Sequence, residues 1–173
     1  MRKDVAATSL RRGWRRALGI GAIAGSGAGL AVLTQQAASG QVTQPIAWLL
    51  LGLFAVAYGV GIVAGLALIE GWSTAPALGV AFWLPQTLQV YSPLVSYQFW
   101  APFNLSVWFD GSNGAMGFVG RLGAMSHLVL GGGGVWGAGL NLSAVAIAIL
   151  LYMTARNDVA VSPAPDGAPS PGG

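Results

Sequence analysis

Residues 45–69 read PIAWLLLGLFAVAYGVGIVAGLALI, an uninterrupted run of apolar and small residues without a single charge. At about 1.5 Å of rise per residue, a helix of this length exceeds the roughly 30 Å hydrocarbon thickness of a bilayer. Because the run would be apolar on every face of a helix, it predicts a membrane-spanning segment.

The composition of the whole chain agrees with a membrane protein. Of the 173 residues, 8% are charged and 54% are hydrophobic. Soluble domains carry about 25% charged residues. There is no cysteine, which excludes disulfides and thiolate metal sites. We therefore expect an all-α, polytopic integral membrane protein with about four transmembrane helices.

The basic residues are concentrated at the N-terminus. Six of the eight precede the first apolar segment: Arg2, Lys3, Arg11, Arg12, Arg15 and Arg16. The positive-inside rule then makes residues 1–16 a cytoplasmic arm, as in a bacterial-type inner membrane. Nucleic-acid binding is not expected, because no aromatic or polar residues extend the arm into a binding surface.

Residues 17–39 form the first predicted span, which is rich in Ala and Gly. Its glycines recur at every fourth residue, a spacing that lets another helix approach closely: Gly21, Gly25 and Gly29. The alternative is a cleavable export signal, because Arg11-Arg12, the weakly apolar stretch and Ala37-Ala38-Ser39 together resemble a twin-arginine signal. Further apolar segments follow, which favours a retained helix. The 45–69 span offers a similar small face: Ala57, Gly61 and Gly65.

Two further spans are predicted, near residues 77–100 and 136–155. The 77–100 segment is uncharged and long enough to cross, although prolines would kink it. If it is helical, its polar side chains gather on one side: Gln86, Gln89, Ser96 and Tyr97. The aromatic and Gly-rich residues between these spans lie on the non-cytoplasmic side. If residues 115–135 also cross, there are five spans and the C-terminal tail, residues 157–173, lies outside; its composition predicts disorder.

Catalysis is not expected. In the four-span topology, the two acids near the bundle, Glu70 and Asp110, lie on opposite sides of the membrane and cannot act as a pair. A serine nucleophile needs a base, and His127 is the single histidine. The sequence therefore predicts a protein that is not an enzyme.

His127 has two interpretations. The simpler is an interfacial histidine that hydrogen-bonds to backbone or water. The other is an axial ligand of a tetrapyrrole. A six-coordinate haem would then need Met116, Met125 or a partner chain as its second ligand, whereas a chlorophyll-type magnesium accepts one imidazole.

The leading functional hypothesis is a non-catalytic membrane subunit that packs against other membrane protein chains through its small-residue faces. An alternative is a small oligomeric transporter or channel that uses the polar side of the 77–100 helix. The third hypothesis is a pigment- or haem-binding protein that uses His127.

Overall fold

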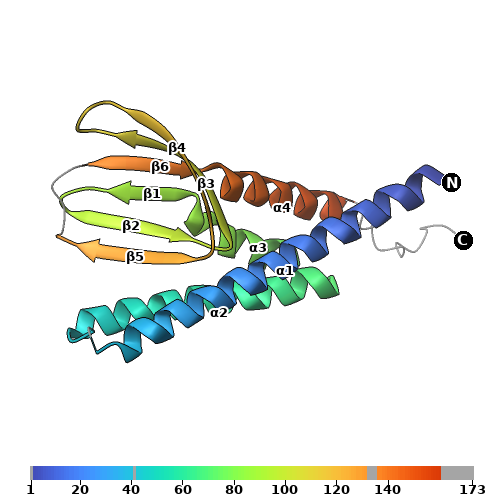
Figure 1. Cartoon of the computed structure of the whole chain (residues 1–173). Coiled ribbons are helices and arrows are strands. Elements are labelled where there is room, and N and C mark those ends of the chain that lie inside the picture. Colours follow the sequence, from blue (N-terminus) through green and yellow to red (C-terminus); the bar gives the residue numbers. More distant parts are fainter. Residues whose placement is uncertain (1, 41, 132–135, 161–173) are drawn as a thin grey trace, which may run out of the picture.

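The computed structural model describes residues 2–40, 42–131 and 136–160, and it is a mixed α/β structure. Two long antiparallel helices form an N-terminal hairpin, followed by a six-stranded antiparallel sheet and two shorter helices (Figure 1). The helices are α1 (Arg2–Ala38), α2 (Pro45–Glu70), α3 (Ala75–Trp83) with the 3₁₀ turn η1 (Leu84–Gln86), and α4 (Leu142–Ala160). The strands are β1 (Leu88–Tyr91), β2 (Val95–Trp100), β3 (Phe103–Asp110), β4 (Met116–Leu122), β5 (Met125–Leu130) and β6 (Gly137–Asn141).

The prediction of an all-α protein with about four spans is therefore wrong. Two helices of the described chain are long and apolar enough to cross a membrane, Arg12–Ala38 within α1 and Pro45–Glu70. By length and composition, the first could also be a signal sequence or a buried core helix.

The predicted third and fourth spans each contain a helix joined to strand. In the 77–100 segment, helix α3 ends at Trp83, Pro85 lies in η1, and strands β1 and β2 follow. The 136–155 segment begins as strand β6. The apolar part of α4, Leu142–Thr154, is about 20 Å long at the usual helical rise, too short to cross. Of the predicted tail, residues 157–160 continue α4 and residues 161–173 lie outside the described residues.

The sheet is built on one long bent hairpin. Strand β2 runs into β3 through Ala101 and Pro102, and β4 runs into β5 through Gly123 and Ala124. One register continues across the bend: Val95 pairs with Leu130, Trp100 with Met125, Phe103 with Leu122 and Phe109 with Met116. Strands β1 and β6 then join the two arms, which gives the order β4-β3-β6-β1-β2-β5. The bend curls the sheet and gives it two faces of different shape.

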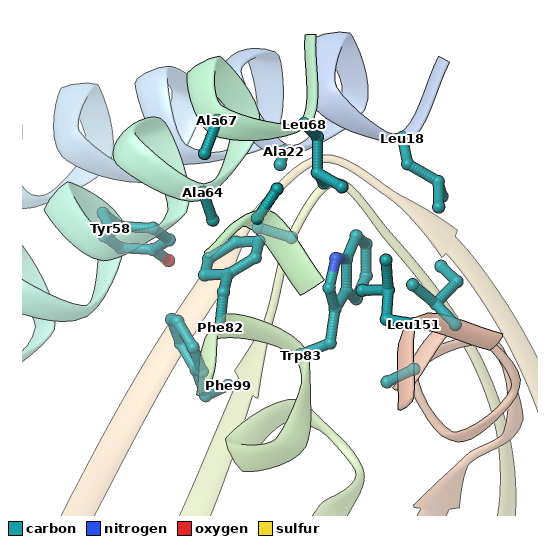
Figure 2. Close-up of a cluster of buried hydrophobic side chains, with 14 of the residues drawn as sticks. Leu18, Ala22, Tyr58, Ala64, Ala67, Leu68, Phe82, Trp83, Phe99 and Leu151 are labelled. Atoms are coloured by element: carbon teal, nitrogen blue, oxygen red, sulfur yellow. The ribbon is translucent and has the colours of Figure 1, made fainter. Parts of the chain in front are cut away.

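Aromatic side chains join the sheet to the helices. The Phe99 ring, 2% exposed, lies 5.7, 5.3 and 6.4 Å by centroid from Phe54, Tyr58 and Phe82. Figure 2 shows Phe82 and Trp83 of α3 between α2 on one side and Leu151 of α4 on the other. This cluster fixes the curled sheet against the helical hairpin.

Gln86 holds the bend of the sheet in place. Its Nε2 donates to the Phe82 carbonyl at 3.0 Å, and its Oε1 accepts from the Ala101 backbone N–H at 2.7 Å. The side chain is fully buried, so these bonds satisfy groups that water cannot reach. Gln86 thus ties the end of α3 to the corner between β2 and β3.

Candidate functional site: a pocket inside the curled sheet

The six strands carry polar and apolar side chains on opposite faces. Residues directly opposite in neighbouring strands share a face, so the register defines both faces. The side chains of the inner face are those of Gln89, Tyr91, Ser96, Gln98, Trp100, Asn104, Ser106, Trp108, Asp110, Val119, Arg121, Met125, His127, Val129 and Asn141. The outer face includes Leu88, Phe99, Leu105, Val107, Phe118, Leu122, Leu128, Leu130 and Leu140. On the β2–β5 arm the outer face packs against the helices through Phe99, whereas on β4 its apolar side chains are exposed.

A chain of hydrogen bonds runs across the inner face. Tyr91 Oη donates to Gln98 Oε1 at 2.8 Å, and Gln98 Nε2 donates to Gln89 Oε1 at 3.2 Å. Gln89 Nε2 donates to Asn104 Oδ1 at 3.1 Å, which also accepts from Ser106 Oγ. From Tyr91 to Gln89 each side chain donates to the next one, and the series ends at Asn104 Oδ1, which accepts two hydrogen bonds.

A pocket of about 430 Å³ opens from the inner face, within the usual size range for small-molecule sites. It is lined by Tyr91, Gln98, Trp108, Phe109, Asp110, Val119, Arg121, Trp136 and Gly137. Gly139 makes room for one wall, because a Cβ there would lie 2.9 Å from the Trp108 ring. Tyr91 and Trp108 pack at 5.1 Å by ring centroid, and Phe109 and Trp136 at 5.5 Å.

The pocket has one cationic and one anionic side chain, and they differ in how they are satisfied. Asp110 accepts from the hydroxyl and the backbone N–H of Ser112, at 2.6 and 2.9 Å, and these bonds lower its pKa. Arg121 forms no ion pair within the described ranges. Its charge acts on Tyr91, whose pKa burial raises and Arg121 lowers in part. The pocket therefore holds one guanidinium and one carboxylate, and the two are not paired with each other among the described residues.

Several buried N–H groups of the inner face lack an acceptor among the described residues. They are Trp100 Nε1, Asn104 Nδ2 and Asn141 Nδ2. Asn104 lies directly opposite Arg121 in the β3–β4 register. Asn141 uses its Oδ1 as the N-cap of α4, accepting from Ala144 N–H at 3.3 Å, which leaves its amide N–H free. These three donors are buried, and none of the three residues is among those that line the pocket.

The four predicted polar residues do not share one side. Gln89 and Ser96 lie on the inner face of the sheet, and Gln86 is buried at the bend. Tyr97 lies on the outer face, where its hydroxyl donates to the Pro85 carbonyl at 2.8 Å. The helix that would have aligned them, and on which the transport hypothesis rested, is absent from residues 88–100.

His127 lies on the edge strand β5, opposite Gln98. It lines a second cavity, of about 290 Å³, between β5 and the loop end of the α1–α2 hairpin. Of the two methionines considered as second haem ligands, Met125 lies two residues away and Met116 lies in the other arm of the hairpin. The described residues contain no group of three or more His, Cys, Asp or Glu placed to hold a metal.

The predicted small residues occupy several contacts. A Cβ at Gly65 would lie 2.6 Å from the Gly19 carbonyl oxygen, and one at Gly61 would overlap Ser26 and Phe82. A Cβ at Gly29 would overlap the Tyr58 ring, and one at Gly25 would lie 2.7 Å from Pro102 at the sheet bend. Gly21 is looser, with Pro102 at 3.6 Å, and Ala57 is half-buried. Gly19 also makes a close contact, although it is not part of the predicted repeat of glycines at every fourth residue.

Sequence reasoning missed the pocket residues Tyr91, Trp108, Arg121 and Trp136. The available signal was strict alternation, as in residues 103–110 (FNLSVWFD), where every second residue is polar or tryptophan. No protein-family model, curated protein or solved structure matches this chain.

Proposed function

We propose that this protein is a non-catalytic integral membrane subunit that packs against partner membrane proteins. Helices α1 and α2 would anchor it in a bacterial-type inner membrane, with the N-terminus in the cytoplasm. The apolar outer face of the curled sheet is the observation that carries the proposal.

The surface of α2 supports the anchor. In its most apolar window only 17% of the residues are buried, whereas the core helix of a soluble protein is mostly buried. Large apolar side chains are exposed along it: Leu49, Leu53, Val56, Val63 and Leu66. Arg12, Arg15 and Arg16 gather around the C-terminal end of α2, so the cations mark one end of the hairpin. The positive-inside rule places that end in the cytoplasm.

Partner chains are needed wherever the sheet lies relative to the lipid. On its outer face, Met116, Phe118 and Leu122 of β4 are 74%, 64% and 89% exposed. In water this apolar face is of the kind that marks an interaction site. In lipid its side chains are satisfied, but β4 is an edge strand, and unpaired edges do not occur in hydrocarbon. A neighbouring chain would cover the apolar face in water and would pair with the strand edge in lipid.

The titratable groups support a non-catalytic role. Asp110 lies in the first cavity and His127 in the second, so no acid–base pair is formed by the two. Glu70 accepts a hydrogen bond from Trp72 Nε1 at 2.6 Å at the far end of the helical hairpin.

Photo-crosslinking in native membranes tests the proposal. A photoreactive phenylalanine analogue at Phe118, on the outer face, is expected to give a discrete adduct with a second polypeptide or a second copy. The matched control replaces the adjacent Val119, which faces inward, and should give none. Native mass spectrometry after mild detergent extraction should find the same complex. A lone monomer, together with no adduct at position 118, would contradict the proposed role.

A further inference from the structure

We propose that the pocket inside the curled sheet binds an amphipathic phosphate ester, with the phosphate held by Arg121 and the apolar body by the aromatic wall. This site does not depend on the partner proteins proposed above. The same chemistry can come from a soluble phosphate ester or from an anionic phospholipid.

The cation of the pocket is the group that would hold an anion. Arg121 lines the pocket without an ion pair among the described residues, whereas Asp110, the carboxylate of the lining, accepts its hydrogen bonds from Ser112. A guanidinium presents a fork of N–H groups that matches phosphate or carboxylate oxygens. An unpaired arginine on the polar side of an apolar-walled structure is thus a candidate for anion recognition.

An unpaired donor beside Arg121 agrees with an anionic group there. Asn104 lies opposite Arg121 across the strands, and its buried amide N–H group, which is outside the pocket lining, lacks an acceptor among the described residues. Its carbonyl oxygen cannot help, because it already accepts from Gln89 and Ser106. An acceptor-rich group complements an unpaired donor, and an ionised phosphate ester offers several acceptor oxygens.

The walls define the rest of the ligand. The Tyr91–Trp108 pair presents apolar ring surfaces on the inner face, and Phe109, which belongs to the outer face by register, and Trp136 also line the pocket. The cavity, at about 430 Å³, exceeds what an inorganic ion would fill. The fitting ligand therefore carries a ring or an alkyl segment beside its phosphate.

Binding to the full-length purified chain tests the site. Phenyl phosphate is titrated into protein in phosphatidylcholine nanodiscs, and retained lipid is measured by native mass spectrometry in nanodiscs that contain phosphatidylglycerol. Arg121→Gln should weaken binding of whichever probe binds the wild type, phenyl phosphate or phosphatidylglycerol, by about 10- to 100-fold, as expected for lost charge-assisted hydrogen bonds. Arg121→Lys should retain part of the affinity, and Arg12→Gln, in the N-terminal arm, should change nothing.

A second variant guards against a folding effect. Val119→Phe keeps the charge and fills the pocket, and it should also abolish binding while the unfolding midpoint stays near that of the wild type. Saturable phenyl phosphate binding assigns the site to a soluble ester, and Arg121-dependent retention of phosphatidylglycerol assigns it to a lipid. If neither probe binds wild type better than Arg121→Gln, the inference is overturned.

Discussion

Replacing Phe99 by alanine is expected to lower the free energy of unfolding by about 3–5 kcal/mol, the usual cost of removing a buried phenylalanine. Phe99 is 2% exposed and contacts three rings, from Phe54, Tyr58 and Phe82. The substitution would open a cavity where the sheet, α2 and α3 meet. Unfolding in mild detergent, followed by circular dichroism as denaturant is added, measures the effect.

Phe118→Ala is the matched control for this prediction. This substitution removes the same atoms from the other arm of the bent hairpin, but the Phe118 side chain is 64% exposed. Its replacement should change the free energy of unfolding by less than about 0.5 kcal/mol. Equal losses for the two variants would mean that Phe99 does not join the sheet to the helices.

Gly65→Ala is the second substitution with a large expected effect. The added Cβ would lie 2.6 Å from the Gly19 carbonyl oxygen, a backbone atom that cannot move aside without separating α1 from α2. We expect a loss of about 1–3 kcal/mol in the free energy of unfolding, as in other overpacked contacts. The same detergent unfolding assay applies.

Gly59→Ala, on the same helix, is the matched control and should not lower the free energy of unfolding. Nothing lies within 4 Å of a Cβ built on Gly59, so the change only raises helix propensity. It should leave stability unchanged or raise it by up to about 1 kcal/mol. A loss at Gly59 as large as that at Gly65 would show that α2 tolerates no methyl group anywhere, and would remove the argument for close packing at Gly65.

Hydropathy identified the two long helices because a long apolar run is visible in the sequence itself and does not depend on distant residues. The predicted span at 45–69 matches α2, Pro45–Glu70, with the proline at the first turn where a helix tolerates it best. The same criterion failed for residues 77–100 and 136–155. Both are apolar and long, but hydropathy does not distinguish a helix from a helix that continues into a strand.

The alternation of side chains with a period of two residues in these segments indicates strands, which the length of the apolar run does not. Residues 95–100 (VSYQFW) alternate between the outer face and the inner face, and Pro93 and Pro102 flank the strand rather than kink a helix. A helical reading placed Gln86, Gln89, Ser96 and Tyr97 together. A strand separates even from odd positions, so Ser96 and Tyr97 point to opposite faces.

The pocket depends on long-range pairing that local patterns do not specify. Arg121 comes to lie opposite Asn104, and Gly139 beside Trp108, only after the long hairpin bends and β6 inserts between its arms. In the sequence Arg121 is an isolated charge between apolar segments. Its place on an inner face required the register of the sheet.

The central claim is that the exposed apolar side of β4 contacts lipid or a partner protein, whereas its other side does not. Labelling of single cysteines at consecutive positions 117–122 of β4 with a water-soluble maleimide tests this directly, because the chain has no native cysteine. In membranes, we predict that positions 117, 119 and 121 react and that positions 118, 120 and 122 are protected. After detergent denaturation all six should react. Equal reactivity of both sets in intact membranes would contradict the claim, because it would place the outer face of the sheet in water.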